Sequence, residues 1–214
     1  MSSLRELLAE FSPLLVLDAA SSHVQVGVLS RNGEARWATS EDEAGVAVFT
    51  SLEKLGDNVA DVGAFVFCDG PGSILGIRTV AMALRTWGVL KPRPFFAYTS
   101  LALVAHAAGD NQLSVIADAR RDAWHHYRIG EGLRRLPTTA LPTDTTWVTP
   151  EGFRHWTPLP PAVKRTPYVL SELLPRVAEL DLFLRTDAPD AFLHEEPSYV
   201  TWTPQIHRAP TTKP

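Results

Sequence analysis

The order of short apolar runs and longer amphipathic segments in the first half of the chain constrains the fold most strongly. Three strand-like runs between residues 14 and 40 come first, and the pair Asn32-Gly33 favours a hairpin between the last two. The segments that follow alternate between helix and strand: 41–56, 62–67, 74–90, 93–98 and 100–108. The predicted order is βββαβαβα. An antiparallel meander extended by parallel strands through crossover helices gives a mixed sheet with helices packed on it, so we predict an α/β fold.

The pattern breaks near residue 110, at a Gly-Asp-Asn stretch. A strand, a tight turn at Ala119–Asp122 and a second strand follow. Prolines then punctuate the remaining chain, which favours short strands and loops with one helix around residues 175–184. We therefore predict two lobes: residues 1–110 form an N-terminal βββαβαβα lobe, and residues 111–214 form a smaller, Pro-rich C-terminal lobe.

Composition narrows the class of protein. The 214 residues are 45% hydrophobic and 21% charged, as in ordinary globular proteins. A formal net charge of −4 gives no overall attraction for phosphate backbones, so a nucleic-acid contact has to be local. The basic pairs Arg120-Arg121, Arg134-Arg135 and Lys164-Arg165 are dispersed, and we expect them on solvated faces. One cysteine excludes an internal disulfide, and no run reaches the ~20 apolar residues that span a bilayer. We expect a cytoplasmic protein with no contact to a membrane.

The stretch CDGPGSILGIR, residues 68–78, lies between a predicted strand and a predicted helix, where many proteins hold a phosphate. A P-loop needs Lys and then Ser or Thr directly after its last glycine, and Ile77 and Arg78 stand there instead. The spacing also differs from the G-x-G-x-x-G fingerprint of dinucleotide-binding proteins. Both of these phosphate-binding motifs therefore fit poorly.

A structural role fits the loop better. Gly70 and Gly72 turn the chain, Ser73 caps the following helix, and Gly76 lets that helix pack closely against its neighbour. We expect Arg78, about one turn later, to lie on the inner side and to bind loop carbonyls. An anion held at the helix N-terminus remains the alternative, because free backbone N–H groups point there.

Several motifs give a resemblance to a known family. GPGSILGIR resembles the G-P-G-S-F-T-G-[LV]-R sequence of the TsaB family, and LLVLDAASSHVQVGVL resembles that family's opening strand and hairpin. VIADARRDAWHHYRI, with Asp118, Ala119 and Arg120, resembles its Asp-Ala-Arg strand–turn–strand, and EEPSYVTW resembles its Pro-x-Tyr tail. The resemblance covers residues ~14–130 well and the remainder weakly, which is typical of families whose loops diverge.

The resemblance implies an actin/Hsp70-like ATPase (RNase H-like) architecture, with two lobes that each carry a mixed sheet and packed helices, the second lobe being reduced. It also implies a function. TsaB is the non-catalytic dimerization partner of TsaD, the transferase that makes threonylcarbamoyladenosine beside the tRNA anticodon. A TsaE-type ATPase is a further implied partner, ATP is implied only in the complex, and direct contact with tRNA stays open.

The sequence contains no catalytic constellation. Its seven histidines show no H-x-x-x-H spacing, and the adjacent His125 and His126 point to opposite faces of a strand. The histidine pair that holds a metal in TsaD-type relatives has no counterpart. Cys68 ends an apolar strand, so we expect a buried thiol. We therefore predict no catalytic residue, no metal site and no cofactor for the chain alone.

Asp18 is the carboxylate at the end of a buried strand. In phosphotransferases of the implied fold, an aspartate at this position holds Mg²⁺ and a following hydroxyl assists with phosphates. Here Ala19 and Ala20 stand where the TsaB family has Thr and Ser, which weakens the case for nucleotide hydrolysis. Two roles stay open for Asp18: a carboxylate that caps a turn, or one member of an anion site with the glycine loop and Arg78.

Two predicted helices are apolar around more of their circumference than one sheet requires. Excess apolar surface of this kind marks interfaces, and the resemblance implies that these helices pack against TsaD. The predicted interface positions are Ala47, Val48, Phe49, Leu52, Ile77, Val80, Ala81, Leu84 and Trp87. The alternative is a wide stripe buried inside the monomer.

This chain diverges from the family at several positions. Leu75, Val80 and Thr86 replace residues that are commonly Thr, Gly and Gly, and Ala123 replaces a common Glu. A valine in a close helix contact typically costs ~1–3 kcal/mol, so the interface is expected to have adapted to its own partner or to serve self-association. Two other functions stay open: a small ATP-dependent phosphotransferase or peptidase-like enzyme of the same fold, and a homodimeric structural paralogue.

Overall fold

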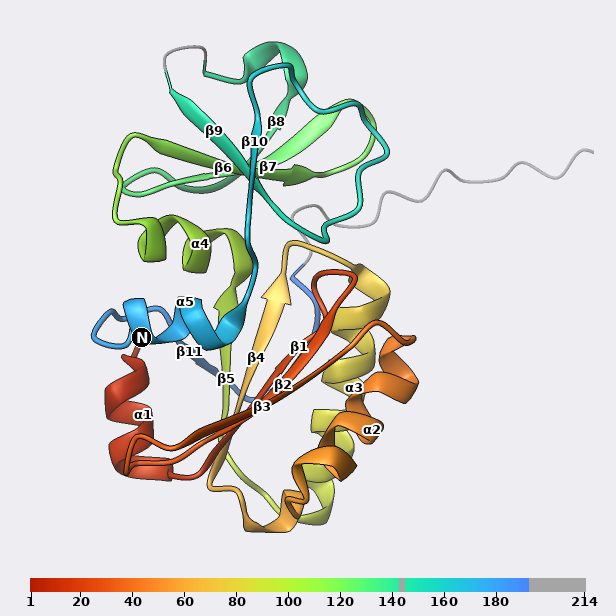
Figure 1. Cartoon of the computed structure of the whole chain (residues 1–214), viewed down its shortest axis with the longest axis vertical. Helices are drawn as coiled ribbons and strands as arrows, with labels where there is room; N and C mark the ends of the chain where they lie inside the picture. The colour runs from red at the N-terminus through yellow and green to blue at the C-terminus, as the bar shows by residue number, and fades with distance from the viewer. Residues whose placement is uncertain (143–144, 193–214) are drawn as a thin grey trace, which may run out of the picture.

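The computed structural model describes residues 1–142 and 145–192, which form two lobes stacked along the long axis of the molecule (Figure 1). The first lobe is built on a mixed sheet of order β11-β5-β4-β1-β2-β3. Its strands are β1 (Leu14–Asp18), β2 (Val24–Leu29), β3 (Ala35–Ser40), β4 (Ala64–Gly70), β5 (Phe95–Thr99) and β11 (Leu184–Thr186). The antiparallel meander is confirmed, because β1 pairs with β2 and β2 with β3. The parallel extension is confirmed by the pairs β1–β4 and β4–β5.

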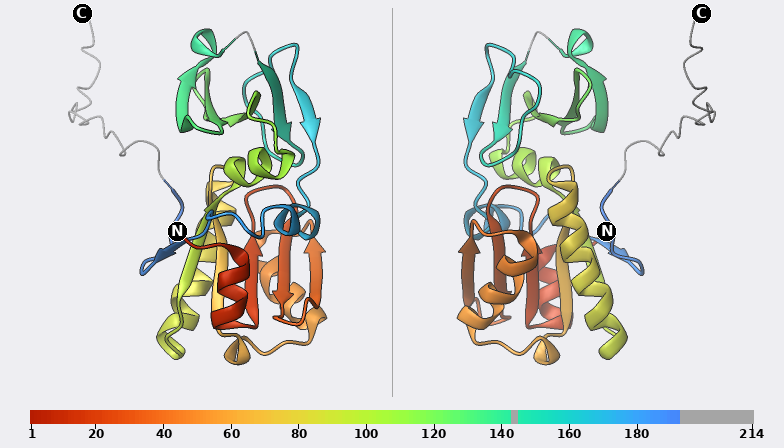
Figure 2. Two further views of the ribbon diagram at one scale, coloured as in Figure 1. Left: turned by 90° about the vertical axis from the view of Figure 1, so that its left-hand side faces the viewer. Right: turned by 90° about the vertical axis from the view of Figure 1, so that its right-hand side faces the viewer.

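Helices cover both faces of this sheet (Figures 1 and 2). One face carries α2 (Ala44–Leu55) and α3 (Ile74–Leu90), with the 3-10 turn η1 (Val59–Asp61) between them in the chain; the other carries α1 (Leu4–Phe11), α4 (Ser100–Ala108) and α5 (Leu170–Arg176). The strand period of two explains the division. In β1, Leu15 and Leu17 face α2 and α3, whereas Leu14 and Val16 face the opposite core. The order βββαβαβα predicted for this region is confirmed.

The second lobe has a mixed sheet of order β10-β9-β6-β7-β8. Its elements are β6 (Leu113–Asp118), β7 (Ala123–Arg128), β8 (Gly132–Pro137), the 3-10 turn η2 (Thr138–Ala140), β9 (Thr146–Pro150) and β10 (Lys164–Thr166). The predicted strand–turn–strand is confirmed in β6 and β7, which pair antiparallel. Helix α4 contacts both β6 and the first lobe's β5, so it lies between the lobes (Figure 1).

The predicted second lobe is wrong in its extent. After β10 the chain returns to the first lobe, where α5 packs on α4 and β11 pairs antiparallel with β5. The second lobe therefore comprises residues 113–166 and is inserted into the first. Residues 193–214, which include the EEPSYVTW resemblance, lie outside the described residues.

Two helices also differ from the expectation. The first, α1, was not predicted, although Ser3 and Glu6 form a reciprocal capping box at its start. The second, α5, comes earlier than residues 175–184, because Leu170, Leu173 and Leu174 at helical spacing are buried against the core and outweigh the helix-breaking tendency of Pro175. Within the described part of the chain, no helix combines the length and the apolar character needed to cross a bilayer.

Candidate functional site

The loop between β4 and α3 packs directly on the turn that follows β1. A Cβ atom on Gly72 would lie 2.5 Å from the carbonyl oxygen of Ala20, and one on Gly76 would lie 2.3 Å from the carbonyl oxygen of Ala19. No larger residue fits at these separations. Ser73 caps α3, since its Oγ accepts the N–H of Gly76 at 3.3 Å. The loop thus fastens α3 to the end of β1.

Three N–H groups at the start of α3 are already used. The N–H of Ser73 donates to the carbonyl of Ala20 at 2.8 Å, that of Ile77 donates to the carbonyl of Ser73 at 2.9 Å, and that of Gly76 donates to the cap. Gly70 adopts a φ of 127°, which favours glycine. The structural roles expected for these loop residues are the ones observed, and an anion bound here remains a prediction.

Arg78 does not bind the loop carbonyls as expected. It follows the buried Ile77, and the ~100° turn per helical residue directs its side chain to the surface. Its Nε lies 3.9 Å from the carboxylate of Asp190. Arg85, two turns further along α3, reaches the same carboxylate at 3.1 Å and donates to the carbonyl of Pro189 at 2.6 Å. The two arginines therefore hold the segment after β11 against α3.

Asp18 is completely buried where the lobes meet. Its Oδ2 accepts hydrogen bonds from the hydroxyls of Tyr98 at 2.5 Å and Tyr168 at 2.7 Å, and its Oδ1 accepts the N–H of Ala20 at 2.8 Å. Burial raises the pKa of Asp18 above its ordinary value, although these hydrogen bonds act in the opposite direction. The turn-capping role is therefore observed. Tyr98 and Tyr168 are far away in sequence, and no local pattern pointed to them.

A second polar side chain holds the same crossing segment. Gln25 of β2 donates its Nε2 to the carbonyl of Tyr168 and accepts the N–H of Leu170 at Oε1, both at 2.9 Å. Asp18 and Gln25 thus fix the chain where it leaves the second lobe and enters α5. The two side chains join the lobes through buried hydrogen bonds.

The residues present do not fit a magnesium–nucleotide site of the kind that the fold implies. The carboxylate of Asp18 is turned to two tyrosines and a backbone N–H, and the alanines after it have no hydroxyl for a phosphate. Cys68 is buried 4.0 Å from the hydroxyl of Tyr168, and burial raises the pKa of its thiol well above the ordinary value, which keeps the thiol protonated.

Asp69 is a site residue that the sequence interpretation missed. Burial raises its pKa to about 7, and its Oδ1 has no hydrogen-bond partner among the described residues. Its backbone carbonyl accepts the N–H of Phe192 at 2.7 Å, so the loop also contacts the segment that follows β11. The signal for it was an acidic residue near the end of an apolar strand, since Asp69 is the last residue but one of β4.

The predicted partner interface needs correction at the level of residues. Most of its positions are buried in the chain's own core, beneath α2 and α3: Ala47, Val48, Leu52, Ile77, Val80, Ala81 and Leu84. Buried side chains cannot contact a partner, so these seven assignments are wrong. Trp87 is half-buried and stacks on Phe65, and Phe49 alone among the nine is exposed. The alternative of a wide stripe buried inside the monomer is correct for most of the stripe.

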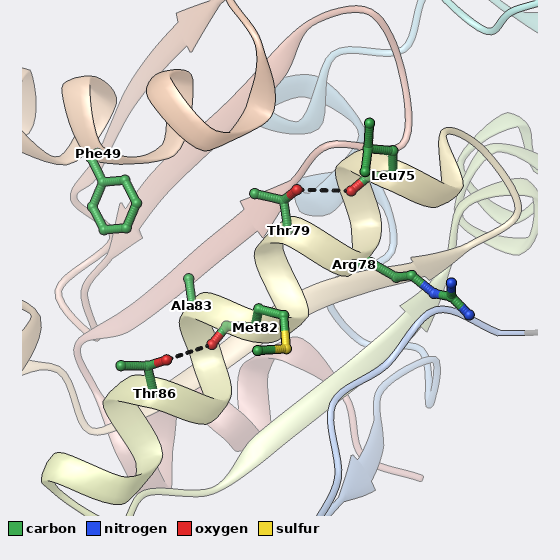
Figure 3. A pocket seen from close by; sticks show the side chains of 7 residues that line it. All are labelled: Phe49, Leu75, Arg78, Thr79, Met82, Ala83 and Thr86. Carbon is green, nitrogen blue, oxygen red and sulfur yellow. Dashed lines mark hydrogen bonds between the residues drawn. The ribbon is translucent and has the colours of Figure 1, made fainter.

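An apolar surface nevertheless remains on the outer sides of these helices. Leu75 is 79% exposed, Met82 58% and Val46 53%, next to Phe49 at 50%. A shallow pocket of about 430 Å³ lies between the helices, with Phe49 on the α2 side and Leu75, Arg78, Thr79, Met82, Ala83 and Thr86 on the α3 side (Figure 3). Thr79 and Thr86 donate their hydroxyls to the carbonyls one turn back, both at 2.9 Å, which leaves mainly methyl groups facing the pocket. We call this surface the α2–α3 face.

The second lobe contains a buried Ser–His pair. His126 Nε2 lies 2.9 Å from Ser114 Oγ, and burial lowers the pKa of the imidazole, which is therefore neutral at pH 7. Neither side chain is exposed, so the pair is part of the core and not a nucleophile with its base. Across residues 1–142 and 145–192, no group of three or more His, Cys, Asp or Glu side chains is placed to hold a metal ion.

Several solved structures resemble this arrangement, and two of them share its fold over most of their length. YeaZ from Pseudomonas aeruginosa is 25% identical, with a TM-score of 0.51 over 65% of this chain and 76% of that chain. This is a TsaB/YeaZ-like chain. A second structure, an uncharacterized protein with similarity to peptidase YEAZ from Pseudomonas aeruginosa, is 22% identical and shows the same fold, with a TM-score of 0.55 over 77% of this chain and 89% of its own. No model of a protein family matches the sequence, and no curated protein matches it.

The TsaB/YeaZ-like fold is the α/β, actin/Hsp70-like architecture that the motifs implied. The structure also changes the interpretation of the positions at which this chain departs from the family pattern. Val80 is buried beneath α3 in this chain's own core, so it obstructs no external helix contact. Leu75 and Thr86 lie on the α2–α3 face, where they alter the surface itself.

Proposed function

We propose that this TsaB/YeaZ-like chain is a non-catalytic assembly partner of a TsaD-type transferase in tRNA threonylcarbamoyladenosine synthesis in the cytoplasm. A TsaE-type ATPase is the further partner, and ATP enters only with the complete complex. The observation that carries the proposal is the α2–α3 face, where several apolar side chains are exposed side by side on two neighbouring helices. Apolar surface gathered in this way marks a protein interface.

Phe49, Leu75 and Met82 are the contacts we assign to the partner, in place of the seven buried positions. An aromatic ring, a leucine and a methionine around a shallow pocket provide the apolar anchors that typically dominate binding energy. Arg78 also lines the pocket, and its Nε lies 3.9 Å from the carboxylate of Asp190. The hydrogen bonds that occupy Asp18 support a role without nucleotide chemistry in this chain alone.

The test is association of the purified chain with the TsaD-type protein of the same organism, followed by size exclusion and calorimetry. Leu75→Glu and Met82→Glu place a charge on the α2–α3 face and are each expected to weaken binding by at least about tenfold, since burying an unpaired charge is costly. Leu184→Glu, an exposed apolar position on β11, is the matched control and should bind as wild type does.

The proposal fails if the wild-type chain does not associate, or if the two glutamate variants bind as tightly as the control. Sedimentation of the chain alone addresses the homodimeric alternative, because a dimer that the TsaD-type protein cannot separate contradicts the proposal. Calorimetry with ATP and Mg²⁺ tests the phosphotransferase alternative. Tight binding of ATP by the chain alone contradicts the scaffold role.

A further inference from the structure

The second lobe differs in charge from the chain that surrounds it. Residues 113–166 contain eight Lys or Arg and five Asp or Glu, a formal charge of +3, within a chain whose formal charge is −4. The remainder of the chain is therefore acidic. Such an asymmetry between parts of one chain suggests a local contact with an anionic polymer.

Part of this charge is held at the turn between β6 and β7. Arg120, Arg121 and Asp122 have φ angles of 61°, 53° and 53°, the left-handed region that residues with side chains rarely adopt. The turn is closed by the N–H of Ala119, which donates to the carbonyl of Ala123 at 2.9 Å. Three such residues in a row are uncommon, and strained backbone of this kind concentrates at functional sites. The turn places two adjacent arginines at the end of the hairpin.

An exposed tryptophan lies beside this turn. The guanidinium of Arg120 stacks over the ring of Trp156, 4.4 Å from its centroid, and Trp156 is 58% exposed. Asp118 fixes both partners: its Oδ1 accepts the N–H of Arg120 at 2.6 Å, and its Oδ2 accepts the N–H groups of Trp156 at 2.7 Å and Thr157 at 2.6 Å. An indole and a guanidinium are thus held in a stack at the surface by one carboxylate.

Three more exposed arginines are close to the stack in the sequence or in space. Arg121 follows Arg120, Arg154 precedes Trp156 by two positions, and Arg165 is near enough to His155 to affect its pKa. Burial and then Arg165 lower the pKa of His155, so this histidine is neutral at pH 7. Among the described residues, none of Arg120, Arg121, Arg154 and Arg165 forms an ion pair with a carboxylate. Their charge is available to an external anion.

We propose that this surface, the Trp156–Arg120 stack with Arg121, Arg154 and Arg165, binds an unpaired stretch of single-stranded nucleic acid. A base stacks on the exposed indole–guanidinium pair, and the arginines contact the neighbouring phosphates. Unpaired bases stack on planar aromatic and guanidinium groups. An acidic protein segment would pair with the arginines but would not stack on the indole. The proposed function involves RNA, so RNA is the strand that we expect to bind, and the inference rests on the proposed function for the choice of RNA alone. Binding of a single strand to this surface requires no partner protein.

Fluorescence anisotropy with the full chain tests the proposal. The probes are fluorescein-labelled single-stranded oligonucleotides of about ten nucleotides, one of RNA and one of DNA, with a blunt RNA duplex and poly-glutamate as unlabelled competitors. The single strands are expected to bind, binding is expected to weaken as salt is raised, and neither competitor is expected to displace the probe at equal concentration. Tighter binding of the RNA strand identifies RNA as the ligand, and equal binding identifies any unpaired strand.

The stack is tested by Trp156→Ala, which is expected to weaken binding roughly 5-fold to 100-fold. Trp156→Phe keeps an aromatic face and should stay within about threefold of wild type. Arg121→Ala should weaken binding to every sequence and reduce the slope of log affinity against log salt by about 0.7. Arg185→Ala, an exposed arginine on β11 of the first lobe, is the control and should leave binding unchanged. Because Trp156 is largely exposed, its substitution should leave the melting temperature near that of wild type.

The proposal is overturned if the wild-type chain binds neither strand, if Trp156→Ala binds as wild type does, or if poly-glutamate displaces the probe at equal concentration. These results are separable from those of the partner experiment. Trp156→Ala leaves the α2–α3 face intact and should associate normally with a TsaD-type protein, whereas Leu75→Glu should still bind the oligonucleotide.

Discussion

Each lobe ends its first strand in an aspartate, and the two aspartates make the same local turn. Asp18 closes β1 and Asp118 closes β6. Asp18 accepts the N–H of Ala20 at 2.8 Å, and Asp118 accepts the N–H of Arg120 at 2.6 Å, so each carboxylate caps the backbone two residues further on. In both lobes this strand pairs antiparallel with the next strand of the chain, and the carboxylate caps the turn that follows it.

Their surroundings separate them. Asp18 is buried beneath the second lobe, and burial raises its pKa. Burial acts in the same direction on Asp118, but the N–H groups of Thr157, Arg120 and Trp156 outweigh it and hold the pKa below its ordinary value. A carboxylate with hydroxyl donors in a core ties lobes together, and one with backbone donors at a surface keeps its charge and orders a loop. The same aspartate-capped turn therefore joins the lobes in the interior of one and orders a surface loop of the other.

Asp18→Ala is expected to cause the largest loss of stability. The change leaves the hydroxyls of Tyr98 and Tyr168 buried without their acceptor and opens a small cavity, so the free energy of unfolding should fall by about 3 kcal/mol. Urea denaturation at pH 7 measures it. Asp18→Asn keeps a carbonyl acceptor and should cost less than half as much. An alanine variant as stable as wild type contradicts the role given to Asp18.

Asp69→Asn tests a second carboxyl of the first lobe, which is only partly exposed. Folded Asp69 keeps its proton up to about pH 7, whereas the unfolded chain releases it near 3.8, so wild-type stability should fall as the pH rises through that window. The Asn variant avoids burying a charge and should be more stable than wild type by about 2 kcal/mol at pH 8, with little difference at pH 4. Denaturation series at both pH values measure this. Asp61→Asn, an exposed acid of the same lobe, should change neither value.

Asp118→Ala should have the smallest effect, about 1 kcal/mol at pH 7, because its donors lie near the surface and can turn to water. Its pH dependence has the opposite sign. The native pKa lies below 3.8, so the stabilisation is present above that value and is lost as the pH falls through the native pKa. Thermal melts at pH 7 and pH 3 measure both. Asp122→Asn in the same turn is the control, because asparagine tolerates the left-handed backbone at this position. If Asp118→Ala costs as much as Asp18→Ala, the distinction between the lobes is removed.

Local signals predicted the parts of the fold that depend on local structure. Strand alternation gave the meander, and the Gly-Pro-Gly-Ser sequence gave a turn with a capped helix, because φ preferences and a side-chain cap act within a few residues. Tyr168, by contrast, reaches Asp18 across 150 positions, and β11 is three residues long. Neither has a sequence pattern of its own, since both are defined by the partners they meet after folding.

The interface positions were mistaken for a related reason. Helical periodicity shows that α2 and α3 carry wide apolar stripes, but it does not show which edge of a stripe the sheet covers. Val80 and Leu84 lie at the covered edge, and Leu75 and Met82 lie at the open one. Arg78 was misplaced by the same uncertainty of about one residue around the helix. We expected the basic pairs to lie on dispersed faces. The sequence alone does not show that the chain around Trp156 folds back onto the turn that contains Arg120.

The return of the chain to the first lobe has a consequence for synthesis. Strand β5 gains its pairing with β11 only when β11 emerges from the ribosome, which happens after the second lobe has emerged. Until then the nascent protein displays an open strand edge, which invites pairing with other chains. The second lobe can complete its fold first, whereas the sheet of the first lobe is complete only when β11 has paired with β5.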